Sequence, residues 1–353
     1  MTRISKVREI LNQKHLDAII IMSDYNRRYL SGFTGTSGAL IISKDEQYLI
    51  TDFRYIEQAS SQAKDFTIIN RTNSIIEEVK KLLHDNQYDD IGFEGHDVTY
   101  DTYVELNKSR LTLISISNAV DKIREVKDKE EIALIKKAAT IVDDTYDYIL
   151  TIAKAGMTEK ELKAKLESKM LELGAEGPSF DTIVASGYRG ALPHGVASDK
   201  VIEQGDMVTL DFGAYYNGYC SDITRTFAIG EPDPKLKELY QIVLESQQKA
   251  INEIKAGMTG KEADALARDY LEHKGYGKEF GHSLGHGIGL EIHEGPMLAK
   301  TVNNKLQVNN CVTIEPGVYI DGLGGIRIED DILITENGCE VFTKCTKDLI
   351  VLS

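Results

Sequence analysis

The sequence predicts a protein of two domains, a smaller α/β domain over residues 1–124 and a larger α+β domain over residues 125–353. Three observations predict it. The length of 353 residues corresponds to about two domains. Strand and helix signals alternate in the first third of the chain, as in layered α/β folds. In the remainder an octapeptide recurs with one change, which indicates an internal repeat.

The first domain opens with an expected helix, because apolar residues between positions 4 and 11 share one helical face. The uninterrupted apolar run at 18–22 predicts a buried strand. Further strands are expected at 39–42 and 48–51. The charged stretch at 124–129 carries no periodic apolar residue, and we place the domain boundary there.

The second domain begins with an expected helix, where apolar residues recur at helical spacing from Ile132 to Ile149. Residues 154–161 read KAGMTEKE, and residues 255–262, 101 positions later, read KAGMTGKE. In both copies a glutamate follows the threonine by three residues, the spacing of a helix capping box. VTLDFG at 208–213 and VTIEPG at 312–317 repeat with an offset of 104. Two halves of similar design are therefore expected about a pseudo-twofold axis.

This repeat places acidic residues at matching positions. Asp211 and Glu315 end the two matching strands, and each half adds a second carboxylate, Asp222 and Glu329. Four carboxylates brought together in an interior would repel one another unless cations neutralised them. The pattern therefore predicts a metal site, and four carboxylates match the charge of two divalent ions.

Four of the eight histidines lie in two short segments, His194 in LPHG and the others in the glycine-rich run at 281–294. These others are His282, His286 and His293. Glycines around His286 allow the backbone to turn tightly and to approach a bound species. Beside a carboxylate cluster, these histidines are candidates for metal binding or catalysis.

At these residues the sequence resembles the metal-dependent Xaa-Pro peptidases, aminopeptidase P and prolidase, which share the pita-bread fold with methionine aminopeptidase and creatinase. The resemblance covers nearly the whole chain. The motifs that carry it are LDFG at 210–213, SDITRTF at 221–227, GHSLGHGIGLEIHE at 281–294, IEPGVYI at 314–320 and GIRIEDD at 325–331. It implies a creatinase-like N-terminal domain and a pita-bread catalytic domain.

The resemblance also implies the ligands of two divalent metal ions. Oxygen-dominated ligands with a single imidazole suit Mn²⁺, with Co²⁺, Zn²⁺ or Fe²⁺ as alternatives. The family's five ligands fall on Asp211, Asp222, His286, Glu315 and Glu329.

The activity implied is hydrolysis of the bond between an N-terminal residue and proline by a hydroxide bridging two metal ions. Glu315 is the expected base, which passes the proton of water to the leaving nitrogen. The expected role of His194, His282 and His293 is to bind the substrate and stabilise the tetrahedral intermediate.

Two further residues are candidates for the substrate pocket. Tyr319 lies in the IEPGVYI motif, and Arg327 lies two residues before the ligand Glu329. Arg327 is expected to orient that ligand. With His194 and His293 they complete the predicted substrate-binding set.

Three alternatives fit the sequence less well. Creatinase uses no metal, and the intact set of five ligands argues against it. Methionine aminopeptidase lacks the N-terminal domain, and a non-catalytic pita-bread protein that binds a partner would typically have lost ligands, whereas this sequence retains all five. The choice between a dipeptidase and an aminopeptidase remains open. A strict dipeptidase needs a cation for the substrate carboxylate. Some prolidases carry an arginine after the HE-x-P segment, where this chain has Met297. Arg189, Arg327 or a partner subunit's Arg54 are the candidates to replace it.

Composition and resemblance give the remaining expectations. A formal net charge of −15 disfavours nucleic acid as a partner. The early apolar run is too short for a membrane span or a signal peptide, so we expect a cytoplasmic protein. By resemblance we expect a homodimer acting on peptides with proline at the second position. Phe53, Arg54 and Tyr55 are the segment expected to reach a partner's site.

Overall fold

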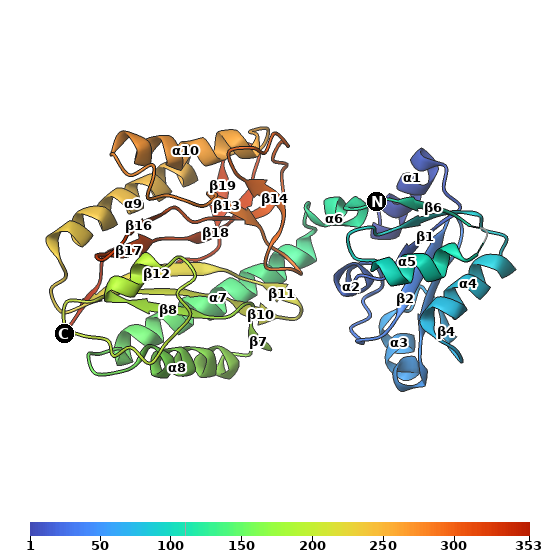
Figure 1. Ribbon diagram of the computed structural model, residues 1–353, viewed down its shortest axis with the longest axis horizontal. Coiled ribbons are helices and arrows are strands. Elements are labelled where there is room, and N and C mark those ends of the chain that lie inside the picture. Colours follow the sequence, from blue (N-terminus) through green and yellow to red (C-terminus); the bar gives the residue numbers. More distant parts are fainter. Residues whose placement is uncertain (110) are drawn as a thin grey trace. The chain divides into compact units, whose positions relative to one another are not determined.

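The computed structural model describes residues 1–109 and 111–353 (Figure 1). The chain folds into two compact units, Met1–Arg124 and Glu125–Ser353. Both mix helices and sheets, so the predicted combination of α/β and α+β structure is confirmed.

The first unit is built on a mixed six-stranded sheet with the order β4-β3-β2-β1-β5-β6. The central strand β1 is fully buried and pairs antiparallel with β2 and parallel with β5. The expected helix at 4–11 and strands at 18–22, 39–42 and 48–51 are all present. The elements are α1 (Arg3–Lys14), β1 (Ala18–Ile21), α2 (Asp24–Ser31), β2 (Ala39–Ser43), β3 (Gln47–Thr51), η1 (Phe53–Tyr55), α3 (Ile56–Gln62), β4 (Thr67–Asn70), α4 (Ile75–Asp85), β5 (Asp90–Phe93), α5 (Tyr100–Asn107), β6 (Thr112–Ser115) and α6 (Ala119–Arg124).

The first half of the second unit packs two helices against a sheet with the order β20-β12-β9-β8. One hydrophobic cluster joins them, with the apolar face of the first helix against the buried strand residues Val208, Leu210 and Phe227. The elements are α7 (Lys129–Ile152), α8 (Glu159–Glu172), β7 (Gly177–Pro178), β8 (Ile183–Ser186), η2 (Gly187–Ala191), β9 (Met207–Phe212), β10 (Ala214–Tyr216), β11 (Tyr219–Cys220) and β12 (Ile223–Ile229).

The second half repeats this design with a sheet of the order β14-β13-β15-β18-β19. Its own hydrophobic cluster packs two helices against Val312, Ile314 and Ile332. The elements are α9 (Pro234–Glu253), α10 (Gly260–His273), β13 (Gly285–Gly287), β14 (Glu294–Leu298), β15 (Cys311–Ile314), β16 (Gly317–Ile320), β17 (Gly324–Arg327), β18 (Asp330–Ile334), β19 (Cys339–Val341) and β20 (Val351–Leu352).

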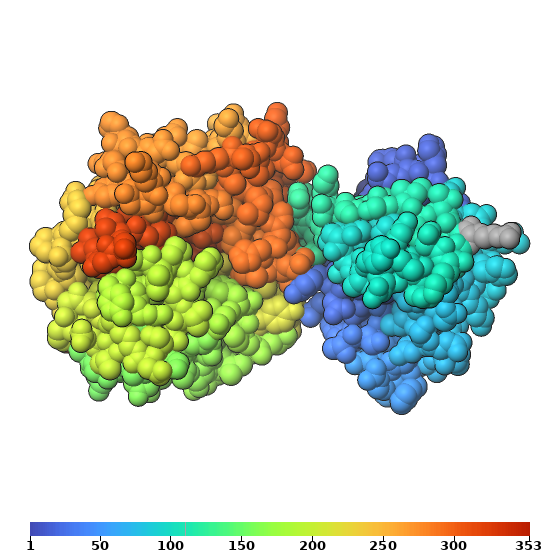
Figure 2. Space-filling view, in the orientation of Figure 1, coloured from blue at the N-terminus to red at the C-terminus, as the bar shows by residue number. Residues whose placement is uncertain are grey.

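The two copies of the octapeptide begin α8 and α10, and both form the predicted capping box. The segments before these helices make matching backbone hydrogen bonds. The Gly156 amide donates to Ile202 O at 2.9 Å, and the Gly257 amide donates to Leu306 O at 2.8 Å. Helices and sheet of the two halves therefore repeat as the sequence predicts. In Figure 2 the halves are the adjoining green and orange regions of this unit.

Within the described residues, no helix is both long enough and apolar enough to cross a membrane.

Candidate metal centre

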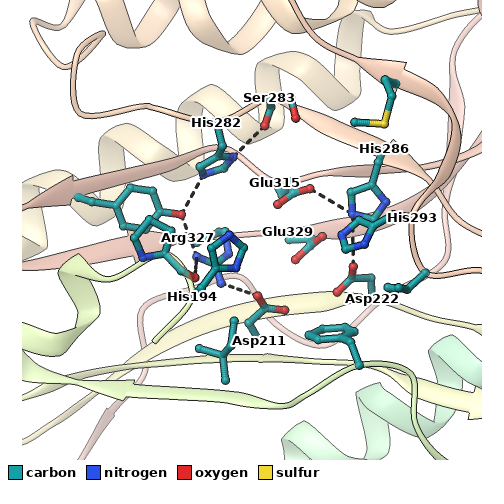
Figure 3. Close-up of a pocket in the computed structure, with 16 residues that line it drawn as sticks. His194, Asp211, Asp222, His282, Ser283, His286, His293, Glu315, Arg327 and Glu329 are labelled. Carbon is teal, nitrogen blue, oxygen red and sulfur yellow. Dashed lines mark hydrogen bonds and ion pairs between the residues drawn. The ribbon is translucent and has the colours of Figure 1, made fainter. Parts of the chain in front are cut away.

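A pocket of about 330 Å³ lies within the second unit and is lined by residues from both of its halves (Figure 3). The ten residues predicted as metal ligands, catalytic residues or substrate-binding residues all line it. Six further residues complete the wall and are mainly apolar. The lining consists of Phe180, Ile183, Pro193, His194, Asp211, Asp222, His282, Ser283, His286, Ile292, His293, Met297, Glu315, Tyr319, Arg327 and Glu329.

The four carboxylates reach the pocket from strand ends. Asp211 lies near the end of β9, and Asp222 directly precedes the paired strand β12. Glu315 directly follows β15, and Glu329 lies between β17 and β18. Antiparallel pairing brings these ends together within each half, and the internal repeat brings the halves together. The convergence expected from the sequence is therefore present.

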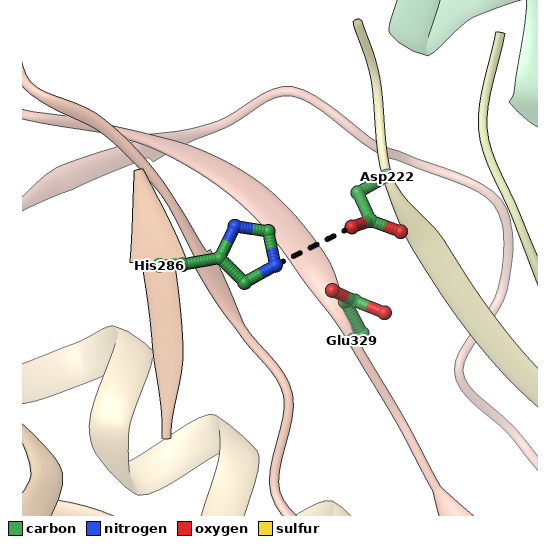
Figure 4. A group of neighbouring side chains, drawn as sticks. All are labelled: Asp222, His286 and Glu329. Atoms are coloured by element: carbon green, nitrogen blue, oxygen red, sulfur yellow. Dashed lines mark ion pairs between the residues drawn. The ribbon is translucent and has the colours of Figure 1, made fainter. Parts of the chain in front are cut away.

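Asp222, His286 and Glu329 each offer one potential ligand atom, and the three atoms lie within 4.8 Å of one another (Figure 4). Nε2 of His286 lies 3.6 Å from Asp222 Oδ2 and 3.4 Å from Glu315 Oε1. Nδ1 of His286 lies 3.0 Å from the carbonyl oxygen of Gly287. Because that carbonyl only accepts, Nδ1 holds the proton and Nε2 turns its lone pair toward the carboxylates.

The surroundings of the cluster disfavour the ionised form of its carboxyl groups. Burial and then repulsion from neighbouring carboxylates raise the pKa of Asp222 and of Glu329 well above their usual values. Burial raises the pKa of Glu315 to about 8, against the opposing field of Arg327. Burial lowers the pKa of His286 to about 4, so its imidazole is neutral at pH 7.

Two buried oxygens at the centre, Oδ1 of Asp222 and Oε1 of Glu329, have no hydrogen-bond partner within residues 1–109 and 111–353. Such oxygens are costly unless a cation or another donor satisfies them. Together with the neutral imidazole of His286 they form an oxygen-rich donor set. The residues present therefore fit divalent metal ions.

Sequence reasoning missed three side chains that contact the carboxylates or the backbone of the predicted ligands. Thr224 Oγ1 donates to Glu329 Oε2 at 2.6 Å, and Thr313 Oγ1 donates to Glu315 Oε1 at 3.1 Å. The backbone amide of Asp222 donates to Asp331 Oδ2 at 2.9 Å. Their positions in the sequence could have indicated them, because each of the three residues lies two positions from a predicted ligand.

Arg327 spans the pocket wall with four different partners. Its guanidinium donates to Asp211 Oδ2, to Thr224 Oγ1 at 3.0 Å and to the hydroxyl of Tyr319 at 2.8 Å. It also donates to the carbonyl oxygen of Pro193 at 3.4 Å. Its closest carboxylate partner is thus Asp211 instead of Glu329, the ligand it was expected to orient.

His282 and Tyr319 lie next to each other on the wall. Nδ1 of His282 lies 2.8 Å from the carbonyl of Ser283, and Nε2 lies 2.9 Å from the hydroxyl of Tyr319. The carbonyl only accepts, so Nε2 of His282 accepts the hydrogen bond from the hydroxyl. Burial lowers the pKa of His282 to about 4, which keeps this ring neutral.

The two remaining histidines differ in their surroundings. The ring of His293 contacts that of His286, with centroids 4.3 Å apart, and burial lowers the pKa of His293. His194 is exposed and lies on the loop that follows η2. Arg189, a candidate clamp for a substrate carboxylate, is instead paired with the buried carboxylate of Glu159 and is not among the described residues that line the pocket.

Comparison with known proteins agrees with this geometry. The model of metallopeptidase family M24 matches residues 133–336, and that of the creatinase/prolidase N-terminal domain matches residues 3–126. The structure of an Xaa-Pro dipeptidase from Bacillus anthracis is 51% identical with a TM-score of 0.98, and 99% of each chain is covered.

Two further relatives cover nearly the same length. The structure of an X-Pro aminopeptidase from Thermotoga maritima MSB8 is 44% identical, with a TM-score of 0.91, over 96% of this chain and 98% of that one. An uncharacterized peptidase of Bacillus subtilis (strain 168) is 49% identical over 99% of this chain and all of its own length. These matches confirm the predicted pita-bread fold with its creatinase-like N-terminal domain. The chain belongs to metallopeptidase family M24.

Proposed function

We propose that this protein hydrolyses the peptide bond between an N-terminal residue and proline. One observation carries the proposal. Four carboxylates and a neutral imidazole converge in one pocket, and two of the carboxylate oxygens are buried without a hydrogen-bond partner among the described residues. Membership of family M24 and similarity to an Xaa-Pro dipeptidase and an X-Pro aminopeptidase support the choice of substrate.

The proposed metal ligands are the five residues that the sequence singled out. When bound, two divalent ions would lower the pKa of a water molecule, so that a nucleophile exists at neutral pH. We propose Mn²⁺ as the resident metal, because oxygen donors outnumber the single imidazole, with Co²⁺, Zn²⁺ and Fe²⁺ as alternatives. The ligands are Asp211, Asp222, His286, Glu315 and Glu329.

The chain's own residues then have separate tasks. Glu315 accepts a proton from the attacking water and delivers it to the proline nitrogen. His194 and His293 donate hydrogen bonds to the peptide as negative charge develops on its carbonyl oxygen. His282 already uses both ring nitrogens, so we propose that it orients Tyr319, which stands between it and Arg327.

The length of the substrate is a second question. Arg327 is the only arginine or lysine among the described residues that line the pocket. Its guanidinium already donates hydrogen bonds to Asp211, Thr224 and Tyr319. Met297 lines the same wall without a charge. We therefore propose that the site accepts Xaa-Pro-Yaa peptides as well as Xaa-Pro dipeptides.

We further propose that the protein is a cytoplasmic homodimer. The chain is similar to an Xaa-Pro dipeptidase from Bacillus anthracis over 99% of each chain, and the expected segment at 53–55 includes the exposed ring of Phe53. Light scattering coupled to size exclusion measures the assembly, and a monomer at micromolar concentration would contradict it.

The experiment that tests the function compares an Xaa-Pro dipeptide with an Xaa-Pro-Yaa tripeptide, using protein stripped of metal and then supplied with Mn²⁺. We expect both peptides to be cleaved at the bond that precedes proline, and only when the metal has been supplied. Cleavage of the dipeptide alone would indicate a strict dipeptidase. Cleavage of neither peptide by protein that retains Mn²⁺ would overturn the proposal.

A further inference from the structure

The loop that carries His194 packs against β17 through η2, and the guanidinium of Arg327 donates to the carbonyl oxygen of Pro193, the residue before His194, at 3.4 Å. The loop leaves β8 at Ser186, passes through η2 and returns at the bridge between Ile183 and Val196. His194 at its tip is exposed, although it lines the pocket. Its position therefore depends on what holds the ends of the loop as well as on this contact with Arg327.

Both ends meet on the carboxylate of Glu159, which is completely buried in the first turn of α8. Oε1 accepts from the amide and hydroxyl of Ser186 at 2.8 and 2.9 Å. Oε2 accepts from the amide and hydroxyl of Ser198 at 2.9 and 2.7 Å, and from Arg189. Arg189 in turn donates to the carbonyl oxygen of Val196 at 2.8 Å. One side chain thus ties together the beginning, the middle and the end of the loop.

The internal repeat shows that helix packing alone does not require this carboxylate. KAGMTEKE and KAGMTGKE differ at one position, where Glu159 corresponds to Gly260. The backbone around the two is equivalent: the Lys160 amide donates to Ser198 O, and the Lys261 amide donates to the carbonyl oxygen of Val302.

The second half leaves no room for a side chain at this position. A Cβ on Gly260 would lie 2.3 Å from the carbonyl oxygen of Met297. The first half instead has space for a carboxylate, and the polar groups of the His194 loop fill its surroundings. A buried carboxylate is costly unless several hydrogen bonds compensate its lost hydration, and here five donors do so.

We propose that Glu159 is a positioning residue, which acts on the reaction by holding the loop of His194 in place against the pocket. The inference rests on the proposed function, in which His194 donates to the peptide. Small displacements of such a group have large effects on rate, because the donor must meet charge where it develops.

The test is a double-mutant cycle of Glu159→Gln and His194→Ala. Gln keeps one acceptor oxygen, but its amide nitrogen faces the donors either of Ser186 or of Ser198 and Arg189, so one end of the loop loses its acceptor. We expect kcat/KM for an Xaa-Pro-Yaa peptide to fall by about 10- to 100-fold. In the His194→Ala background the same change should have less than about a threefold effect, because the positioned group is already gone.

The matched control is Glu161→Gln in the same helical turn. Glu161 is exposed and accepts from the amide of Thr158, so its loss weakens the cap without touching the loop. We expect this variant to retain activity. Equal losses from Glu159→Gln and Glu161→Gln, or full additivity of Glu159→Gln with His194→Ala, would overturn the proposal.

Two further measurements keep the outcome decisive. Ser198→Ala removes one hydroxyl donor to Glu159 and serves if Glu159→Gln fails to fold; it should lower kcat/KM less, and again only when His194 is present. The imidazole NMR signals of His194 should shift in Glu159→Gln but not in Glu161→Gln. Unchanged His194 signals in Glu159→Gln would contradict the inference, whether or not the wild-type protein cleaves Xaa-Pro peptides. Absence of cleavage by the wild-type protein would by itself overturn only the proposed function.

Discussion

The hydroxyl of Tyr319 donates a hydrogen bond to Nε2 of His282 at 2.9 Å while accepting one from Arg327 at 2.8 Å. This arrangement joins the glycine-rich segment before β13 to the hairpin of β16 and β17. It also connects the wall of the pocket to Asp211, because the same guanidinium contacts that carboxylate.

Tyr319→Phe removes the hydroxyl and leaves both His282 and Arg327 short of a partner. We expect kcat/KM to fall by about 10- to 100-fold, since a hydrogen bond to a charged group contributes about 1.5–3 kcal/mol. Metal content should be unchanged. Tyr240→Phe is the matched control, because that buried tyrosine bonds the carbonyl of Lys347, which is not among the pocket-lining residues described. Equal activities of the two variants would contradict the role of Tyr319.

Glu315→Gln removes the proposed proton carrier while preserving the shape of the side chain and an acceptor for Thr313. We expect turnover to fall by about 10²- to 10⁴-fold, the range associated with general acid–base catalysis. Steady-state kinetics beside elemental analysis of bound metal measure the effect. The exposed Glu336→Gln is the control. Near-normal activity of Glu315→Gln with its metal retained would rule out the proposed role.

Thr224→Val removes the hydroxyl that donates to Glu329 and accepts from Arg327. Partners that orient metal ligands typically affect affinity by about 10- to 100-fold, and we expect a loss of that size for Mn²⁺. Competition with a chelator measures it. The buried Thr145 on α7 bonds only its own helix in the contacts described, so Thr145→Val is the control. The prediction fails if both variants bind Mn²⁺ as tightly as wild type.

Metal binding should release protons at neutral pH. Burial raises the pKa of Glu315 to about 8, and burial with mutual repulsion raises those of Asp222 and Glu329. A cation must displace protons held by these groups, so affinity should increase with pH. Calorimetry in two buffers with different ionisation enthalpies counts the protons. An observed binding enthalpy independent of the buffer would contradict this prediction.

The same shifts predict how the stability of metal-free protein depends on pH. For Glu315 the folded state holds its proton more tightly, because its pKa rises from 4.5 to about 8. Its contribution to stability is therefore complete below about 4.5 and is lost as the pH rises through about 8. Thermal unfolding should show this decline in wild type and a smaller one in Glu315→Gln. Identical profiles for the two would refute the assignment.

Sequence reasoning predicted the elements and the members of the site because both leave local patterns. The octapeptide repeat indicated two similar halves, and the matching of Asp211 with Glu315 indicated where carboxylates would meet. Hydrophobic patterns predicted the first helix of each unit and the strands at 18–22, 39–42 and 48–51, since burial of one face is a local property of the chain.

The role of each polar side chain was decided by the tertiary structure. Arg189 was a candidate for binding substrate, but it is held by Glu159, thirty positions earlier in the chain. The proton of His282 is placed by its contacts with Ser283 and with Tyr319, 37 positions away. Such partners come from segments that only folding brings together.

The sequence by itself determined the fold class, the repeat and the residue types that line the pocket. The tertiary structure decided which of them are charged, which are neutral and which are already occupied by another side chain. The physical reason is that a pKa and a hydrogen bond depend on burial and on neighbours in space. For Asp222 one such neighbour, Asp331, lies 109 positions away along the chain.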